Sequence, residues 1–506
     1  MKKFLLMWLI TTVAYVPTGF ARQWSEYSSD NFTVYSDVST RHAESLLQDM
    51  ERFRAAVLMF TGLPDVPEDR RLQIFHFNSR SEFQGFTDKR EIAGFYQETW
   101  DGPLIFSQKG TSWSIPGSGV MFHEYVHHLM RARSNMTYPM WYSEGFAELL
   151  ASATLKRDQI SLGLVPEWRR PVFDGRAFRG PLAVPELLQP DFDASSGSYW
   201  ESFYGSAWLF THYLQLGDLA DNPSYRKQTR DYLLAVHNGA EPITAFEDHF
   251  GVSADAMETE LRKYRRRGIR GASFTSPAYD KPIGHREIPD HERYYLLADK
   301  AFEVGQEQLS RKYLDKALKQ KPNWHPALAL IAVLENHANT PETLSAAEKI
   351  MTNLRASRRA APGDIDDYRT AMNLAHYFMD KLDEIRKTGQ SDHGLQDWAV
   401  NYGQIATSLN PDSIAAHRVL WRAQKNPHAP VTALKTMMNA YQLNPDSLFI
   451  NKEIGFYLAD ARRLDLAAPF LERVLAWSHP GRDRTKAKNL LARLQEQQEE
   501  SAVSAN

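Results

Sequence analysis

A five-residue sequence, LNPDS, occurs twice in the C-terminal part of the chain, at residues 409–413 and at residues 443–447. The two copies are 34 residues apart, and Ala406 and Ala440 precede the two prolines by the same distance. A fixed period of this length indicates a unit of two helices that buries its apolar face only by stacking on its neighbours. The sequence therefore predicts an all-helical array of stacked helix pairs.

The same spacing extends upstream, where Ala317 precedes Pro322 by five residues. Residues 293–495 resemble a tetratricopeptide-repeat solenoid, which has this period and offers a concave surface to a protein partner. The alternative is a plain helical bundle, which the repeated spacing makes the weaker choice. The stretch 352–380 departs from the pattern, and residues 496–506 are expected to form a flexible tail.

The N-terminal half alternates between strand-like and helix-like stretches, which predicts an α+β region over residues 22–115. Residues 31–37, 71–79 and 102–108 have the composition of strands, and residues 40–60 have helical spacing.

From residue 116 to residue 275 the pattern is helical. The last of these predicted helices ends at Gly268, after a run of cations that suits the negative end of a helix. Residues 276–292 contain three prolines and no periodicity, so we expect a linker there. With 506 residues, the chain is long enough for about three domains.

Residues 1–21 have the pattern of a secretory signal. Lys2 and Lys3 precede an apolar stretch at residues 4–16, and small residues follow near Ala21. The apolar stretch is shorter than the roughly 20 residues that span a bilayer, so an uncleaved membrane anchor is the weaker alternative. The chain has no cysteine, which excludes disulfides. We expect export, most simply to the periplasm of a Gram-negative bacterium, with no transmembrane segment after cleavage.

Residues 120–130, VMFHEYVHHLM, carry two histidines four positions apart. On a helix, His123 and His127 lie on one face and can direct imidazole nitrogens at one ion. Glu124 is beside them and could act as a general base without being a ligand. His128 falls on a different face, where a surface or packing role is expected. The motif alone is a weak signal, since it constrains only three positions.

A third ligand follows 17 residues after His127. Glu144, in PMWYSEGFAELL, can be presented by a second helix once a loop has turned the chain back. It would be the third ligand, and catalytic zinc sites need three protein ligands. Glu148, one turn further, could accept a hydrogen bond from the second ring N–H of a ligand histidine. The alternative, a polar helix pair without metal, would leave several ionisable groups buried without compensation.

HEYVH followed by WYSEGFAEL resembles the gluzincin metallopeptidases, and most closely the bacterial peptidase-MA-like proteins, which often carry tetratricopeptide repeats. The likeness covers roughly residues 25–265 and is firm over 120–150. It implies a thermolysin-like α+β peptidase domain over residues 22–275, with one Zn²⁺ held by a glutamate and two histidines.

Two further features qualify the resemblance. Tyr204, in SFYGSAWLFTHYL, is similar to a tyrosine that stabilises the oxyanion in the gluzincin aminopeptidases, although simple packing at a helix start would explain it equally well. The aminopeptidase segment Gly-Ala-Met-Glu-Asn, which captures a substrate's amino terminus, does not occur here. An extended peptide could instead pair with an edge strand at residues 102–108, so we expect an endopeptidase.

The predicted function is zinc-dependent peptide-bond hydrolysis in the cell envelope, with Glu124 as base and Tyr204 as oxyanion donor. The repeats would recruit a protein substrate or partner. The alternative is a non-catalytic periplasmic scaffold with a degenerate peptidase fold, although a scaffold has no need of Glu124. A purely structural zinc fits poorly, because such sites usually have four ligands, often cysteines. The net charge of −3 gives no reason to expect nucleic acid as a partner.

Overall fold

The computed structural model describes most of the chain after residue 22. The described ranges are 23–66, 71–88, 92, 94–99, 102–109, 117–134, 136–156, 158–177, 179–190, 197–276, 278–338, 365–388, 394–425, 430–445, 447–478 and 481–504. The predicted signal, residues 1–21, lies outside them. Within these ranges, every helix is too short or too polar to cross a membrane.

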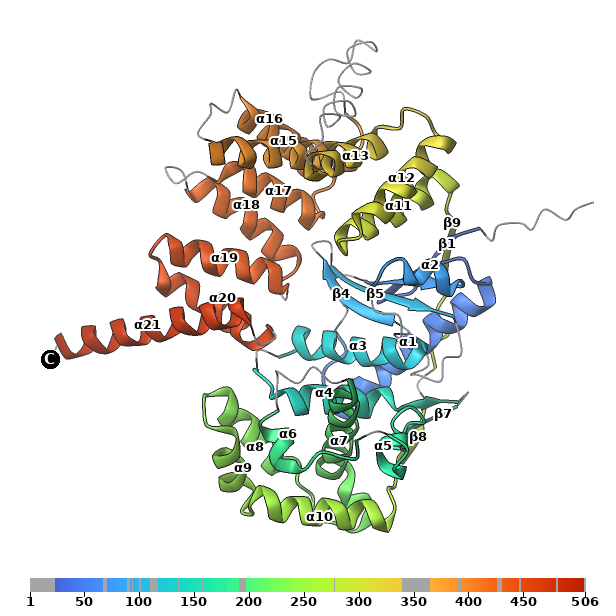
Figure 1. Ribbon diagram of the computed structural model, residues 1–506, viewed down its shortest axis with the longest axis vertical. Coiled ribbons are helices and arrows are strands. Elements are labelled where there is room, and N and C mark those ends of the chain that lie inside the picture. Colours follow the sequence, from blue (N-terminus) through green and yellow to red (C-terminus); the bar gives the residue numbers. More distant parts are fainter. Residues whose placement is uncertain are drawn as a thin grey trace, which may run out of the picture.

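A six-stranded mixed sheet forms the centre of the N-terminal half (Figure 1), in the order β4-β5-β3-β2-β1-β9. The β2–β3 and β3–β5 pairs are parallel, and the other pairs are antiparallel. The strands are β1 (Ser25–Ser28), β2 (Phe32–Ser36), β3 (Leu72–Phe77), β4 (Gly94–Thr99), β5 (Gly102–Gln108) and β9 (Gly284–Glu287). The three strands expected from the sequence are confirmed as β2, β3 and β5.

The edge strand was predicted wrongly. Residues 102–108 form β5, which is an interior strand between β3 and β4. The edge is β4, whose sequence GFYQET was not recognised as a strand because its apolar and polar residues do not alternate clearly. It pairs with β5 on one side, and among the described strands it is the last in the sheet.

The predicted linker is also wrong in part. Residues 284–287 of the segment 276–292 form β9, which pairs with β1 at the far edge of the sheet. All four residues of β9 are exposed and none is aliphatic. Backbone pairing with β1, the stacking of His285 on Tyr27 and the ion pair of Arg286 with Glu26 hold this strand in place. These contacts leave no hydrophobic pattern in the sequence to reveal the strand.

Alternate side chains of the central strands enter two different cores. On one face, Ile74 and Ile105 pack with α1 (Thr40–Thr61) and α3 (Gly117–Ala132). On the other face, Phe75 and Phe106 pack with helices of the C-terminal part. These helices are α11 (Asp290–Glu303), α12 (Glu307–Gln320) and α13 (His325–Ala338). The first helices after the predicted linker thus share a core with the sheet.

Below the sheet in Figure 1 lies a helical region with a small three-stranded sheet. It contains α4 (Met140–Ala151), α5 (Arg170–Asp174), α6 (Val184–Leu188), α7 (Gly197–Leu216), α8 (Arg226–His237), α9 (Pro242–Phe250), α10 (Ala254–Arg267), β6 (Thr154–Leu155), β7 (Gln159–Leu162) and β8 (Ala272–Thr275). A short helix, α2 (Arg80–Gln84), lies earlier in the chain. The predicted stop at Gly268 is confirmed as the end of α10.

The C-terminal region consists of stacked helix pairs. Its later helices are α15 (Tyr368–Thr388), α16 (Leu395–Leu409), α17 (Ile414–Gln424), α18 (Pro430–Leu443), α19 (Leu448–Asp460), α20 (Leu464–Trp477) and α21 (Arg482–Ser504). Of the predicted irregular stretch 352–380, residues 352–364 lie outside the described part, and residues 368–380 belong to the regular helix α15. Helix α21 reaches Ser504, so most of the predicted tail 496–506 is helical, and its flexibility stays a prediction.

The repeated LNPDS sequence has a structural explanation. In both copies the serine is an N-cap: Ser413 Oγ accepts from the Ala416 N–H at 3.2 Å, and Ser447 Oγ accepts from the Ile450 N–H at 3.4 Å. A serine at this position satisfies a backbone donor that the first helical turn leaves free. The repeat therefore marks the same turn between two helices in successive units.

Candidate metal centre

Helices α3 and α4 bring three ligand atoms together. Phe122, Tyr125 and Val126 bury one side of α3 in the core under the sheet. This packing directs His123 and His127, one turn apart, toward α4. Glu144 is in the second turn of α4 and is buried. The two-helix arrangement expected for these three residues is confirmed.

The distances between the ligand atoms are short and nearly equal. The Nε2 atoms of His123 and His127 are 3.1 Å apart. Glu144 Oε2 is 3.3 Å from each of them. Nitrogen and oxygen ligands that bind a tetrahedral ion at 2.0–2.1 Å lie about 3.3 Å from one another. The three side chains could therefore hold one metal ion, and two imidazoles with a carboxylate are a ligand set that suits Zn²⁺.

A close approach of two helices fixes the position of Glu144. The next residue, Gly145, faces α7 so closely that a Cβ atom there would lie 2.3 Å from Thr211 Oγ1 and 2.4 Å from the Ala207 carbonyl oxygen. Any larger residue would push α4 away from α7. The glycine in SEGFAEL is therefore required by packing directly beside a ligand.

Behind the ligands, Glu148 links His123 to a buried arginine. His123 Nδ1 lies 3.4 Å from Glu148 Oε1. Arg169 binds the same carboxylate with two nitrogens, at 2.9 Å through Nε and at 2.5 Å through Nη2. Trp168 Nε1 donates to it at 3.3 Å. Glu148 thus lies where a carboxylate can orient the His123 ring, as the sequence predicts.

Sequence analysis missed Arg169 and Trp168. They lie about 20 residues after Glu148, between β7 and α5, in a stretch with no periodicity. A long-range contact of this kind has no signature in the local sequence. The single indication was that a fully buried carboxylate needs a cationic partner.

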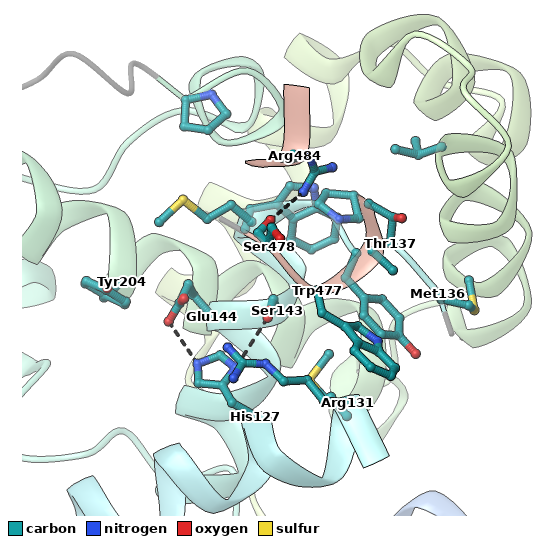
Figure 2. Close-up of a pocket in the computed structure, with 18 of the residues that line it drawn as sticks. His127, Arg131, Met136, Thr137, Ser143, Glu144, Tyr204, Trp477, Ser478 and Arg484 are labelled. Atoms are coloured by element: carbon teal, nitrogen blue, oxygen red, sulfur yellow. Dashed lines mark hydrogen bonds and ion pairs between the residues drawn. The ribbon is translucent and has the colours of Figure 1, made fainter. Parts of the chain in front are cut away.

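The other ligand histidine has a weaker support. His127 Nδ1 is 3.4 Å from the hydroxyl of Ser143, which precedes Glu144 on α4 (Figure 2). His128 lies away from the ligand group, with its ring 5.9 Å from that of Tyr125, as expected for a residue on a different face.

The carboxylates make this group attract positive charge. Burial opposes a charge on His123, yet its hydrogen bond to Glu144 and the charge of Glu148 raise its pKa to about 9. Burial likewise opposes ionisation of Glu144, but the charge of His127 and hydrogen bonds from both histidines hold its pKa well below the usual range. A bound metal ion must displace the proton from His123, because only a neutral imidazole is a ligand.

Tyr204, on α7, lies near the ligand histidine His123. Its ring centroid is 6.4 Å from that of His123, and the Arg169 guanidinium lies 5.1 Å from the ring. The charge of Glu144, then burial, raises the pKa of its hydroxyl well above the usual range. Tyr204 is therefore protonated and is a hydrogen-bond donor at every physiological pH.

A cavity of about 850 Å³ opens in front of the ligand group. Glu124 and Tyr204 line it together with the ligands, and the edge strand β4 contributes Phe95 and Tyr96. Helices from the C-terminal region close another side, where Figure 2 labels Trp477, Ser478 and Arg484. This volume is within the range of roughly 300–1,000 Å³ that is typical of ligand pockets.

Comparison with protein-family models finds no match for this chain, and a search of the curated proteins finds none either.

Proposed function

We propose that this protein is a zinc-dependent peptidase of the gluzincin type. One observation carries the proposal: two imidazole nitrogens and a carboxylate oxygen converge at 3.1–3.3 Å in a cavity of about 850 Å³. The resemblance of HEYVH and WYSEGFAEL to gluzincin motifs supports it, as does the presence of Glu124 and Tyr204 in the same cavity.

His123, His127 and Glu144 would hold the zinc. When bound, Zn²⁺ polarises a carbonyl oxygen and acidifies water, which makes neutral-pH hydrolysis feasible. Glu124, which lines the same cavity, would accept a proton from the attacking water and deliver it to the leaving amine nitrogen. The Tyr204 hydroxyl can donate to the substrate's carbonyl oxygen as negative charge develops there.

The remaining side chains hold these groups in position. Glu148 keeps the His123 ring oriented through Nδ1, and Arg169 neutralises Glu148 so that it can stay buried. Removal of the carboxylate partner of a ligand histidine typically lowers metal affinity or activity by about 10–100-fold.

The edge strand β4 supports an endopeptidase. Among the described strands β4 is the last in the sheet, and its residues Phe95 and Tyr96 line the cavity. An extended peptide could add to β4 by main-chain hydrogen bonds, with its middle residues over the ligand group. This replaces β5 as the strand we propose for substrate pairing.

The helical array completes the proposal. We propose that it is a tetratricopeptide-repeat solenoid that recruits a protein substrate or partner, and that the protein acts in the periplasm after cleavage of residues 1–21. The period of 34 residues and the capping serines of successive units support the first part. The pattern of the N-terminal residues supports the second.

Hydrolysis of casein by the zinc-loaded chain tests the function. Glu124→Gln should keep the metal and lower the rate by about 10²–10⁴-fold. Glu247→Gln, an exposed glutamate on α9, is the matched control and should leave the rate unchanged. Equal rates in the wild-type chain and Glu124→Gln would overturn the proposal. Zinc binding without any hydrolysis would favour the non-catalytic scaffold.

A further inference from the structure

The last helix pair of the array returns to the cavity. Helices α20 and α21 come from residues more than 300 positions after the ligand histidines, yet Trp477 and Arg484 line the same cavity. Figure 1 shows the array arching away from the sheet at α11 and coming back beside α3 at α20. The end of the array therefore forms part of the candidate site.

Helices α20 and α21 form one wall of the cavity, and a hydrogen bond attaches this wall to the ligand-bearing region. Trp477 Nε1 donates to the Ser134 carbonyl oxygen at 3.1 Å, just beyond the end of α3. Trp477 is almost completely buried. The following loop is held from the other side, because the Thr137 N–H donates to His237 Nδ1 of α8 at 3.1 Å. The wall is thus fixed relative to the ligands.

Arg484 is a cation on this wall that has no acidic partner in the described part of the chain. Its Nη1 donates to the Ser478 carbonyl oxygen at 3.0 Å (Figure 2). Among the described residues, no carboxylate forms an ion pair with it, and burial lowers its pKa with no acidic group to offset the effect. A guanidinium has five N–H donors, so most of its capacity remains for a ligand.

The rest of the cavity lining indicates what that ligand is. Apolar side chains line the same cavity as Arg484, and they include Trp477, Met136, Tyr138 and Met140. A partly buried guanidinium beside apolar side chains binds a carboxylate more strongly than an exposed one, because water competes less.

We propose that Arg484 and Trp477 form a specificity subsite for a peptide carboxylate, with the apolar part of the peptide against Trp477. This rests on the proposed function, in which the cavity holds a peptide. The carboxylate could belong to an aspartate or glutamate side chain or to the peptide's C-terminus, and both would bind the same guanidinium.

Binding tests the subsite apart from turnover. The probe is an array of immobilised random ten-residue peptides, prepared once with amidated C-termini and once with free ones. It is incubated with the zinc-loaded full chain carrying Glu124→Gln. We expect Asp- and Glu-containing peptides to bind about tenfold more strongly than Asn and Gln counterparts if the side chain is recognised. A preference limited to free C-termini would assign the subsite to the terminal carboxylate.

Variants decide whether Arg484 is responsible. Adding Arg484→Gln should remove the carboxylate preference, and Arg484→Lys should restore part of it. Arg493→Gln, an exposed arginine on the same helix, should leave it intact. A preference that survives Arg484→Gln, or no preference at all, would overturn the subsite. Casein hydrolysis by the wild-type chain is judged separately, so either proposal can fail while the other stands.

Discussion

Arg169 binds both oxygens of the Glu148 carboxylate, at 2.9 Å and 2.5 Å, while the same carboxylate lies 3.4 Å from His123 Nδ1. Burial raises the pKa of Glu148, but the charge and hydrogen bonds of Arg169 outweigh burial and lower it. Glu148 is therefore an ionised carboxylate, able to accept a hydrogen bond from the His123 Nδ1–H. Through it, a residue outside the sequence motifs affects the orientation of a ligand.

The first prediction follows from this pair. Arg169→Met should weaken zinc binding by about 10–100-fold, because an unpaired Glu148 no longer holds the His123 ring. Competition with a chromogenic chelator measures the affinity. Arg170→Gln is the control, since Arg170 is exposed and forms an ion pair with the exposed Glu167. Unchanged affinity in Arg169→Met would show that Arg169 has no effect on the ligand group.

Gly145→Ala should destabilise the protein, because its Cβ would lie within 2.4 Å of atoms on α7. Overpacking of this kind typically costs about 1–3 kcal/mol. We expect a lower thermal unfolding midpoint and a reduced zinc content, since Glu144 is the preceding residue. Gly197→Ala adds the same methyl group to open space and should change neither quantity. Wild-type stability in Gly145→Ala would contradict the close packing.

Trp477→Ala should loosen the wall formed by α20 and α21. The substitution removes a buried indole and its hydrogen bond to Ser134. Hydrogen–deuterium exchange should become faster in α20 and in residues 136–139, while zinc content stays the same. Trp477→Phe keeps most of the packing and should show a smaller increase. Exchange identical to the wild-type chain would mean that Trp477 does not hold the wall.

His337 should make the helical array more stable at mildly acidic pH. Hydrogen bonds to Asp380 and Glu307, opposed by burial, raise its pKa to about 9. Asp380 also faces His376 and Arg422. Because the folded-state pKa exceeds the usual 6.5, the stabilisation is complete below about pH 6.5 and disappears as the pH rises through about 9.

The test compares His337→Gln with the wild-type chain by urea unfolding at several pH values. The variant should be less stable at pH 6 and nearly equal to the wild-type chain at pH 10. The effect should be modest, because the side chain is partly exposed and solvent screens the pairs. A difference that is the same at every pH would rule out the titration of His337.

Local patterns explain which parts could be predicted. The spacing of His123, His127 and Glu144 was enough to expect one ligand group, since helix geometry relates residues four apart directly. The turns at Ser413 and Ser447 are likewise local, because each serine caps the helix that follows it directly in the sequence. β9 and Arg169 could not be found, because each depends on a partner far away in the chain and has no periodicity of its own. The same is true of Trp477, whose partner Ser134 lies 343 positions earlier in the sequence.

The most direct test of the central claim is the metal content of the purified full chain, measured by inductively coupled plasma mass spectrometry beside Glu144→Ala and the control Glu247→Ala. We predict about one zinc per chain in the wild type and in the control, and a clear loss in Glu144→Ala. No zinc in the wild-type chain after supplementation, or the same zinc content in Glu144→Ala, would contradict the account.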